Sequence, residues 1–101
     1  MVRLYDYYGL EVYFKNKAEL PITVFAKRGD SESAMSITFK NGLVDDIHFL
    51  QVEKELDDED RELFRLLMER NISEIIKMWL DVFLYKRPVE MEVIKSNLKE
   101  Q

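Results

Sequence analysis

Asp46 and His48 come closest, by residue type and spacing, to an acid–base pair, because an imidazole oriented by a carboxylate can move a proton. They stand two positions apart, so a strand would place both side chains on one face. His48 is the only histidine, and no nucleophile motif accompanies it. We therefore expect no catalytic residues and a solvent-facing His48, with Asp46 and His48 as the alternative catalytic pair.

Carboxylates crowd residues 53–62, which raises the possibility of a cation site. Calcium loops, however, need a sharp turn at a glycine, and no glycine follows Gly42. Acidic residues are also favoured at the start of a helix, where they meet the positive end of its dipole. We therefore predict no metal site and no cofactor, and a helix capped by Asp57. The carboxylates in this run are Glu53, Glu55, Asp57, Asp58, Glu59, Asp60 and Glu62.

Five aromatic residues of the first third could form a platform on which nucleic-acid bases stack. Such platforms carry clustered Lys and Arg, whereas the basic residues here are dispersed, so we predict packing rather than nucleic-acid binding. Phe25 is the exception, because strand alternation points it away from the apolar face of its own segment. Either a second layer covers it or it belongs to a binding surface. The five are Tyr5, Tyr7, Tyr8, Tyr13 and Phe25.

The composition is that of one globular domain: 101 residues, 47% hydrophobic and 35% charged. The absence of cysteine excludes disulfides and thiolate zinc sites. The net charge of −5 arises in residues 41–70, which hold 4 Lys or Arg against 10 Asp or Glu, and such a region could meet a basic partner. No signal peptide or membrane span is apparent, so we expect a cytoplasmic protein that does not contact a membrane.

Strands are predicted for about residues 5–52, in four segments of alternating apolar and polar residues: 10–15, 22–27, 35–39 and 43–49. Asn41-Gly42 is a strong hairpin signal. A two-residue loop would place Asp46 opposite Ile37, on the apolar face. We therefore predict a three-residue loop that includes Lys40 and pairs Phe39 with Leu43 and Met35 with Ile47.

Two helices are predicted for about residues 57–86. The first should end near Arg70, and Asn71 could cap the second in a capping box with Glu74. Apolar residues at helical spacing centre on Trp79, which we place in the core. A strand follows at about 89–95. The predicted fold is α+β: an antiparallel sheet of four N-terminal strands, two consecutive helices packed on one face and a C-terminal edge strand.

The order of these pieces resembles the bacterial domain of unknown function family 4160. The resemblance is carried by residues 5–14 (YDYYGLEVYF), 20–24 (LPITV), 28–33 (RGDSES), Asn41-Gly42 and 76–79 (IKMW). It covers the chain from about Tyr5 to about Lys95. It implies a small bacterial protein, and the family's association with two-gene modules of the toxin and antitoxin kind implies a protein partner.

One departure from the family pattern concerns a histidine-rich stretch around its proline. The equivalent positions here are Glu19, Thr23 and Phe25, flanking Pro21, so the three histidines are replaced. If the stretch is the family's active feature, this chain has lost that chemistry. With the tyrosines above, the predicted binding surface comprises Phe25, Thr23, Glu19, Tyr7, Tyr8 and Tyr13.

The function expected from these observations is a non-catalytic binding or regulatory module, one half of a two-protein pair. We expect a protein partner or self-association. Two alternatives remain open: a small ribonuclease-like toxin that relies on Asp46 and His48, and a homodimeric structural protein whose second copy covers the aromatic face.

Overall fold

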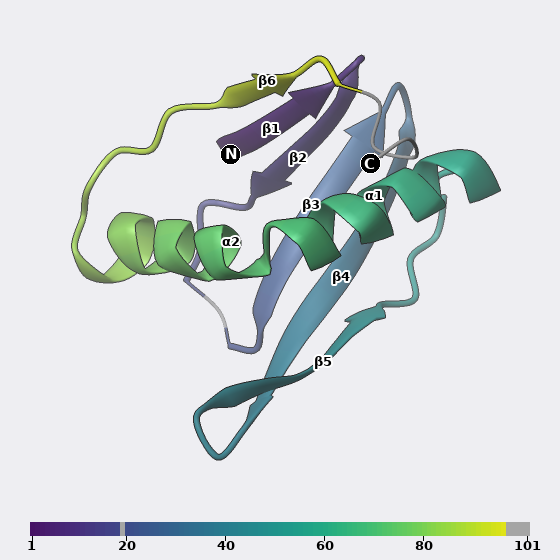
Figure 1. Cartoon of the computed structure of the whole chain (residues 1–101). Coiled ribbons are helices and arrows are strands. Elements are labelled where there is room, and N and C mark those ends of the chain that lie inside the picture. The colour runs from purple at the N-terminus through teal and green to yellow at the C-terminus, as the bar shows by residue number, and fades with distance from the viewer. Residues whose placement is uncertain (19, 97–101) are drawn as a thin grey trace.

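The chain forms a six-stranded mixed sheet with its helices on one face (Figure 1). The structure is a computed structural model that describes residues 1–18 and 20–96. The strand order is β5-β4-β3-β2-β1-β6; neighbours are antiparallel, except that β6 is parallel to β1. The fold is therefore α+β. The strands are β1 (Val2–Tyr7), β2 (Leu10–Phe14), β3 (Ile22–Arg28), β4 (Ser31–Lys40), β5 (Leu43–Phe49) and β6 (Glu92–Ile94); the helices are α1 (Asp58–Arg70) and α2 (Ile72–Trp79), which continues into a π-helical turn, η1 (Leu80–Leu84).

The sheet has five strands before the helices, not the four predicted, because β1 was missed. Its pairing with β2 contains a bulge at Leu4, which breaks the simple alternation of the sequence. The turn between the two strands holds Tyr8 and Gly9, both with positive φ (49° and 88°). Asn-Gly is the usual sequence for such a turn, and a tyrosine at its first position hides the signal.

The predicted β4–β5 register is also wrong. Lys40 pairs with Leu43 around a two-residue Asn41-Gly42 loop, the arrangement that sequence alternation had disfavoured. The apolar residues still face one another, because a bulge further along the hairpin leaves Asp45 without an opposite residue. Ile37 thereby pairs with Ile47, and Phe39 pairs with Val44.

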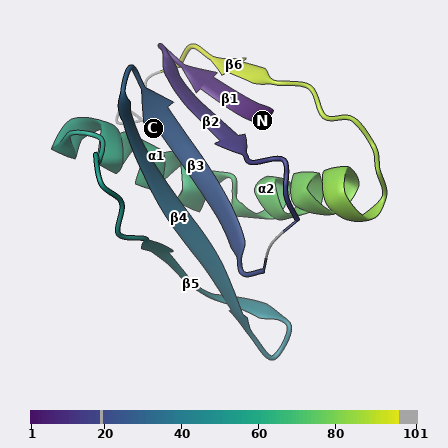
Figure 2. The same ribbon diagram turned by 180° about the vertical axis from the view of Figure 1, so that it is seen from behind.

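The two helices lie in succession across the same face of the sheet, and the view from behind leaves the opposite face in front (Figure 2). Asp57 caps α1 as predicted, and its carboxylate accepts a hydrogen bond of 2.8 Å from the Asp60 N–H. The predicted capping box at Asn71 is not formed. Asn71 instead donates from its side chain to the Leu67 carbonyl at 2.9 Å, which closes the end of α1 rather than the start of α2.

The core lies between the helices and the sheet. Phe64 and Leu67 of α1 and Ile75 of α2 are buried against Val12, Val24 and Ile37 of the sheet. Trp79 differs from expectation, because it is only partly buried at the edge of this core. It packs on Phe83, with ring centroids 5.5 Å apart. The partial exposure of Trp79 opens one corner between the two layers.

The last strand, β6, lies at the sheet edge beside β1 and is shorter than the predicted range of 89–95. The Tyr8 hydroxyl donates to the Lys95 carbonyl just after it. Among the described residues, no helix has the length and apolar character needed to cross a membrane.

Tyr5 joins the sheet to α2. Its ring is fully buried, and its hydroxyl donates to the Glu74 carboxylate at 3.1 Å. Burial raises the pKa of Tyr5 well above its usual value near 10, and the negative charges of Glu74 and Glu92 raise it further. The folded protein therefore holds the phenol proton at a pH where the unfolded chain releases it.

We expect this difference to weaken the fold in alkali. Above pH 10 the unfolded state loses the Tyr5 proton and the folded state keeps it, so this residue should lower the free energy of unfolding by about 1.4 kcal/mol per pH unit. Urea unfolding at pH 9.5 and pH 11 should show a smaller decline for Tyr5→Phe than for the wild type. Tyr85→Phe, at an exposed tyrosine, should keep the wild-type decline. Equal declines in all three proteins would contradict this assignment.

Candidate functional site

The sheet face opposite the helices carries a stacked aromatic pair. Tyr13 of β2 and Phe25 of β3 are cross-strand neighbours, and their rings lie 5.7 Å apart at an angle of 23°. Ile22, Val24 and Ala26 of β3 face the helices, so Phe25 must point the other way. Phe25 is half-buried, whereas Tyr13 is only 3% exposed.

Lysine side chains cover this aromatic pair in place of a second layer. The Lys15 ammonium lies 4.3 Å from the centroid of the Phe25 ring, and the Lys27 ammonium lies 5.5 Å from that of Tyr13. Each lysine also has a carboxylate partner at 3.7 Å, Glu32 for Lys15 and Glu11 for Lys27. Partial burial raises the pKa of Glu32. The alkyl stems therefore shield the rings, while the charged ends stay at the surface.

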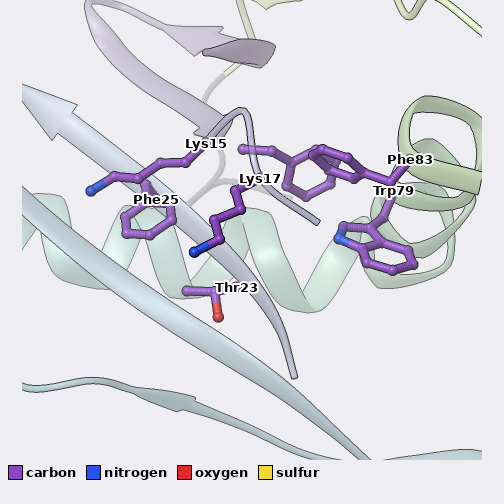
Figure 3. A pocket seen from close by; sticks show the side chains of 7 residues that line it. Lys15, Lys17, Thr23, Phe25, Trp79 and Phe83 are labelled. Atoms are coloured by element: carbon purple, nitrogen blue, oxygen red, sulfur yellow. The ribbon is translucent and has the colours of Figure 1, made fainter. Parts of the chain in front are cut away.

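A cavity of about 110 Å³ opens where β2 ends and β3 begins. Figure 3 shows Lys15, Lys17, Phe25 and Thr23 on one side of it, and Trp79 and Phe83 on the other. The cavity therefore joins the open sheet face to the corner that Trp79 leaves between the two layers. Its lining residues are Phe14, Lys15, Lys17, Thr23, Phe25, Trp79 and Phe83.

Only part of the predicted binding surface comes together. Phe25, Thr23 and Tyr13 share the open face. Tyr7 is buried on the helix side, because the tight turn at Tyr8-Gly9 sets it opposite Leu10, whose side chain is in the core. Tyr8 lies in the turn after β1, and its ring is nearly perpendicular to that of Tyr7, with 4.8 Å between the ring centroids. Glu19 lies outside the described residues.

The structure brings Asp46 and His48 together, with 3.2 Å between Asp46 Oδ2 and His48 Nδ1. Both side chains are largely exposed. Across the strands, His48 pairs with Ser36, and Ser36 pairs with Thr23. Ser36 is only 2% exposed, and its Oγ lies 3.3 Å from the Thr23 hydroxyl, on the side of β4 away from β5. An orienting carboxylate is thus in place, but the Ser36 hydroxyl is buried and engaged with another strand, and the Thr38 hydroxyl donates to the Asp46 carbonyl at 3.3 Å.

Within the acidic run of residues 53–62, Asp57 and Asp60 stabilise the fold. Asp57 caps α1, and Asp60 binds Arg28 through two hydrogen bonds, of 2.8 and 3.3 Å. The described residues hold no group of three or more His, Cys, Asp and Glu side chains arranged to hold a metal ion.

Sequence reasoning missed Lys15, Lys17 and the aromatic wall of the cavity. A weak local signal exists, because Lys15 and Lys17 are two positions apart just after a strand and beside the polar link to Pro21. Trp79 was expected in the core alone, but together with Phe14 and Phe83 it lines the cavity. Their contribution to the cavity wall depends on where α2 crosses the end of β2, and local periodicity in the sequence does not specify that crossing.

A second hollow, of about 550 Å³, lies between the start of β1 and the segment after η1. The described lining residues are mostly apolar and include Arg3 and Arg87.

No family model matches this chain, and neither a curated protein nor a solved structure matches it.

Proposed function

We propose that this chain is a non-catalytic binding module that contacts a protein partner through the open sheet face around Phe25. The observation that carries the proposal is the half-buried Phe25 ring, held between Tyr13 and the Lys15 ammonium beside the cavity. An aromatic ring that is already fixed in place loses little entropy when a partner covers it. Such a ring is a suitable anchor for recognition.

The cavity favours binding over acid–base catalysis. Among the residues that the structure describes, none that lines the cavity is a histidine or a carboxylate, and the polar groups of this lining are two lysines, a threonine and the indole of Trp79. Asp46 and His48 belong to the strand on the far side of β4 and do not line it. The groups that could transfer protons are therefore separate from the hollow that could hold a ligand.

Charge indicates what kind of partner would fit. The sequence as a whole is acidic, yet the ammonium groups of Lys15, Lys17 and Lys27 gather around the Tyr13–Phe25 pair or the adjoining cavity. Lys15 and Lys27 each have a carboxylate partner, so a complementary surface would present an apolar side chain bordered by charged groups of both signs. The association implied by the resembling family suggests where to look for the partner, namely the product of an adjacent gene.

Phe25→Ser tests this proposal. We expect the variant to lose capture of the adjacent gene's product, with at least about a tenfold weaker dissociation constant by calorimetry, because removal of a central aromatic anchor costs roughly 2 kcal/mol or more. Phe39→Ser is the matched control, since Phe39 is an exposed phenylalanine on the β4–β5 hairpin and should bind like the wild type. Thermal melting checks that both variants fold. Unchanged affinity in folded Phe25→Ser protein would overturn the proposal, and sizing at two concentrations would show whether a second copy of the chain is the partner.

A further inference from the structure

No strand of the described chain lies beside the outer edge of β5. This strand is the last in the order β5-β4-β3-β2-β1-β6, and both ribbon views show it at the margin of the sheet (Figure 1, Figure 2). It is seven residues long, whereas β6, the strand at the other edge, has three. Because an exposed edge carries unpaired backbone N–H and C=O groups, β5 is a template for a further strand.

The backbone groups of β5 that point outward follow from its pairing with β4. The Leu50 N–H donates to the Ala34 carbonyl at 2.8 Å, so the backbone groups of Leu50 face β4. The pairing is regular from residue 46 to residue 49, and the backbone groups of an antiparallel strand point alternately to its two sides. Those of His48 therefore also face β4, whereas those of Ile47 and Phe49 face the open edge.

The charges of β5 favour a second copy of β5 as the added strand. In a twofold dimer the two strands run antiparallel, and each contact is made twice. If the axis passes between the two Ile47 residues, their outward backbone groups bond to each other, and Asp46 of each copy lies opposite His48 of the other. An axis at Asp46 would oppose two carboxylates, and an axis at His48 would oppose two imidazoles. β5 is therefore complementary in charge to itself in the register centred on Ile47.

Asp46 and His48 interact within one chain and still have atoms available for a second copy. Asp46 Oδ2 lies 3.2 Å from His48 Nδ1, and both side chains are largely exposed. Among the described residues, neither Asp46 Oδ1 nor His48 Nε2 has a hydrogen-bond or ion-pair partner. Because a carboxylate can only accept, Nδ1 is the donor in this contact, and a protonated imidazole donates from Nε2 as well. A protonated His48 can therefore bridge its own Asp46 and the Asp46 of a second copy.

We propose that this chain forms a homodimer in which the β5 strands of two copies pair antiparallel about Ile47. The two sheets then continue as one sheet, with the helices of both copies on the same side. Ile47 and Phe49 are only partly buried at the edge of the core, and the second copy covers them further. Phe25 belongs to β3, with β4 between it and β5, so the dimer leaves the proposed partner surface open on both copies.

Sedimentation equilibrium at pH 6 tests the dimer. We expect the wild type to have twice the mass of one chain. His48→Glu should raise the dimer dissociation constant at least about tenfold, because each Asp46 would then face a carboxylate. Glu90→Lys is the matched control, since Glu90 is an exposed charged residue outside β5, and it should dimerise like the wild type. A monomeric wild type, or a folded His48→Glu variant that dimerises like the wild type, would overturn the proposal.

A mixture of two charge variants tests the register. Asp46→Lys, like His48→Glu, should be monomeric alone, because it sets a lysine opposite His48. In an equimolar mixture, the new lysine of one variant meets the new glutamate of the other, and His48 meets Asp46. The mixture should therefore form a heterodimer, with a dissociation constant at least about tenfold lower than that of either variant alone. A mixture that associates no more tightly than its components would overturn the register centred on Ile47.

The bridge through His48 also predicts a pH dependence. In its own chain His48 lies opposite the uncharged Ser36 of β4, and the helices cover the other face of the sheet, so the charged group beside it is Asp46. The imidazole loses its proton near pH 6.5, and Nε2 then has no hydrogen to donate. The dissociation constant should therefore be larger at pH 8 than at pH 6, and equal constants would overturn the bridge.

The dimer and the proposed partner surface are distinguished by their variants. Phe25→Ser should abolish partner capture and leave the dimer intact, whereas His48→Glu should abolish the dimer and leave partner capture intact. Loss of the dimer in folded Phe25→Ser protein would place the contact between copies on the open sheet face and overturn the β5 interface. Capture unaffected by Phe25→Ser, with a dimer that His48→Glu dissociates, would overturn the proposed partner surface alone.

Discussion

Phe64→Ala is expected to lower the free energy of unfolding by about 3 to 5 kcal/mol. Phe64 is fully buried in the middle of α1, and its ring meets the Phe49 ring edge-on with 6.0 Å between centroids. The substitution removes this ring contact between the helix and β5 and leaves a cavity that the rigid sheet cannot fill. A domain of this size has about 5 to 15 kcal/mol of total stability, so the variant should be close to unfolding.

Urea titration of Phe64→Ala and Phe39→Ala separates burial from residue type. Phe39 is 44% exposed on the β4–β5 hairpin, and its truncation should cost about 1 kcal/mol or less. Melting temperatures should follow the same order, with a fall of roughly 15 °C or more for Phe64→Ala. Similar losses at the two positions would show that the helix layer contributes less to stability than its burial indicates.

The sequence predicts helices better than strand pairing, and the reason is physical. The start of α1 at Asp57 depends on a local hydrogen bond, and the stripe through Ile75 has the helical period, so nearby residues determine both. Strand pairing instead depends on where a bulge falls. The bulges at Leu4 and Asp45 each change which residues share a face, and neither has a distinctive sequence.

In the candidate site, too, nearby residues determine the position of some side chains, whereas contacts between distant segments determine the position of others. Alternation along β3 is enough to place Phe25 and Thr23 on the face opposite the helices. The cavity required the crossing of α2 over the end of β2, which brings Trp79 near Lys17 from a distant part of the chain. Tyr7 was wrongly assigned to the binding surface, because the tight turn at Tyr8-Gly9, which has no distinctive sequence, pairs it with Leu10 and places it in the core.

A three-way contact at Arg28 accounts for the position of α1 relative to the sheet. At the end of β3, Arg28 donates from Nε and Nη2 to the Asp60 carboxylate and from Nη1 to the Tyr8 carbonyl, at 2.7 Å. Asp60 is only 8% exposed. Gly9 also belongs to this arrangement, since a Cβ there would lie 3.0 Å from Arg28 Nη1. One guanidinium thus ties together the β1–β2 turn, β3 and the first turn of α1.

Arg28→Met is therefore expected to cost about 2 kcal/mol of unfolding free energy, because it leaves the Asp60 carboxylate nearly buried without its cation. Lys27→Met is the matched control: Lys27 contacts Glu11 at 3.7 Å near the surface, and its loss should cost less than about 0.5 kcal/mol. Urea unfolding of both variants measures the difference.

Adding Asp60→Asn to Arg28→Met identifies the cause of the loss. If an uncompensated buried charge destabilises the single variant, neutralising Asp60 should restore about 1 kcal/mol, although the same change in the wild type should be destabilising because it breaks the ion pair. Opposite signs in the two backgrounds are the expected signature of direct coupling. Additive losses would mean that Arg28 acts through its packing and its bond to the Tyr8 carbonyl rather than through Asp60.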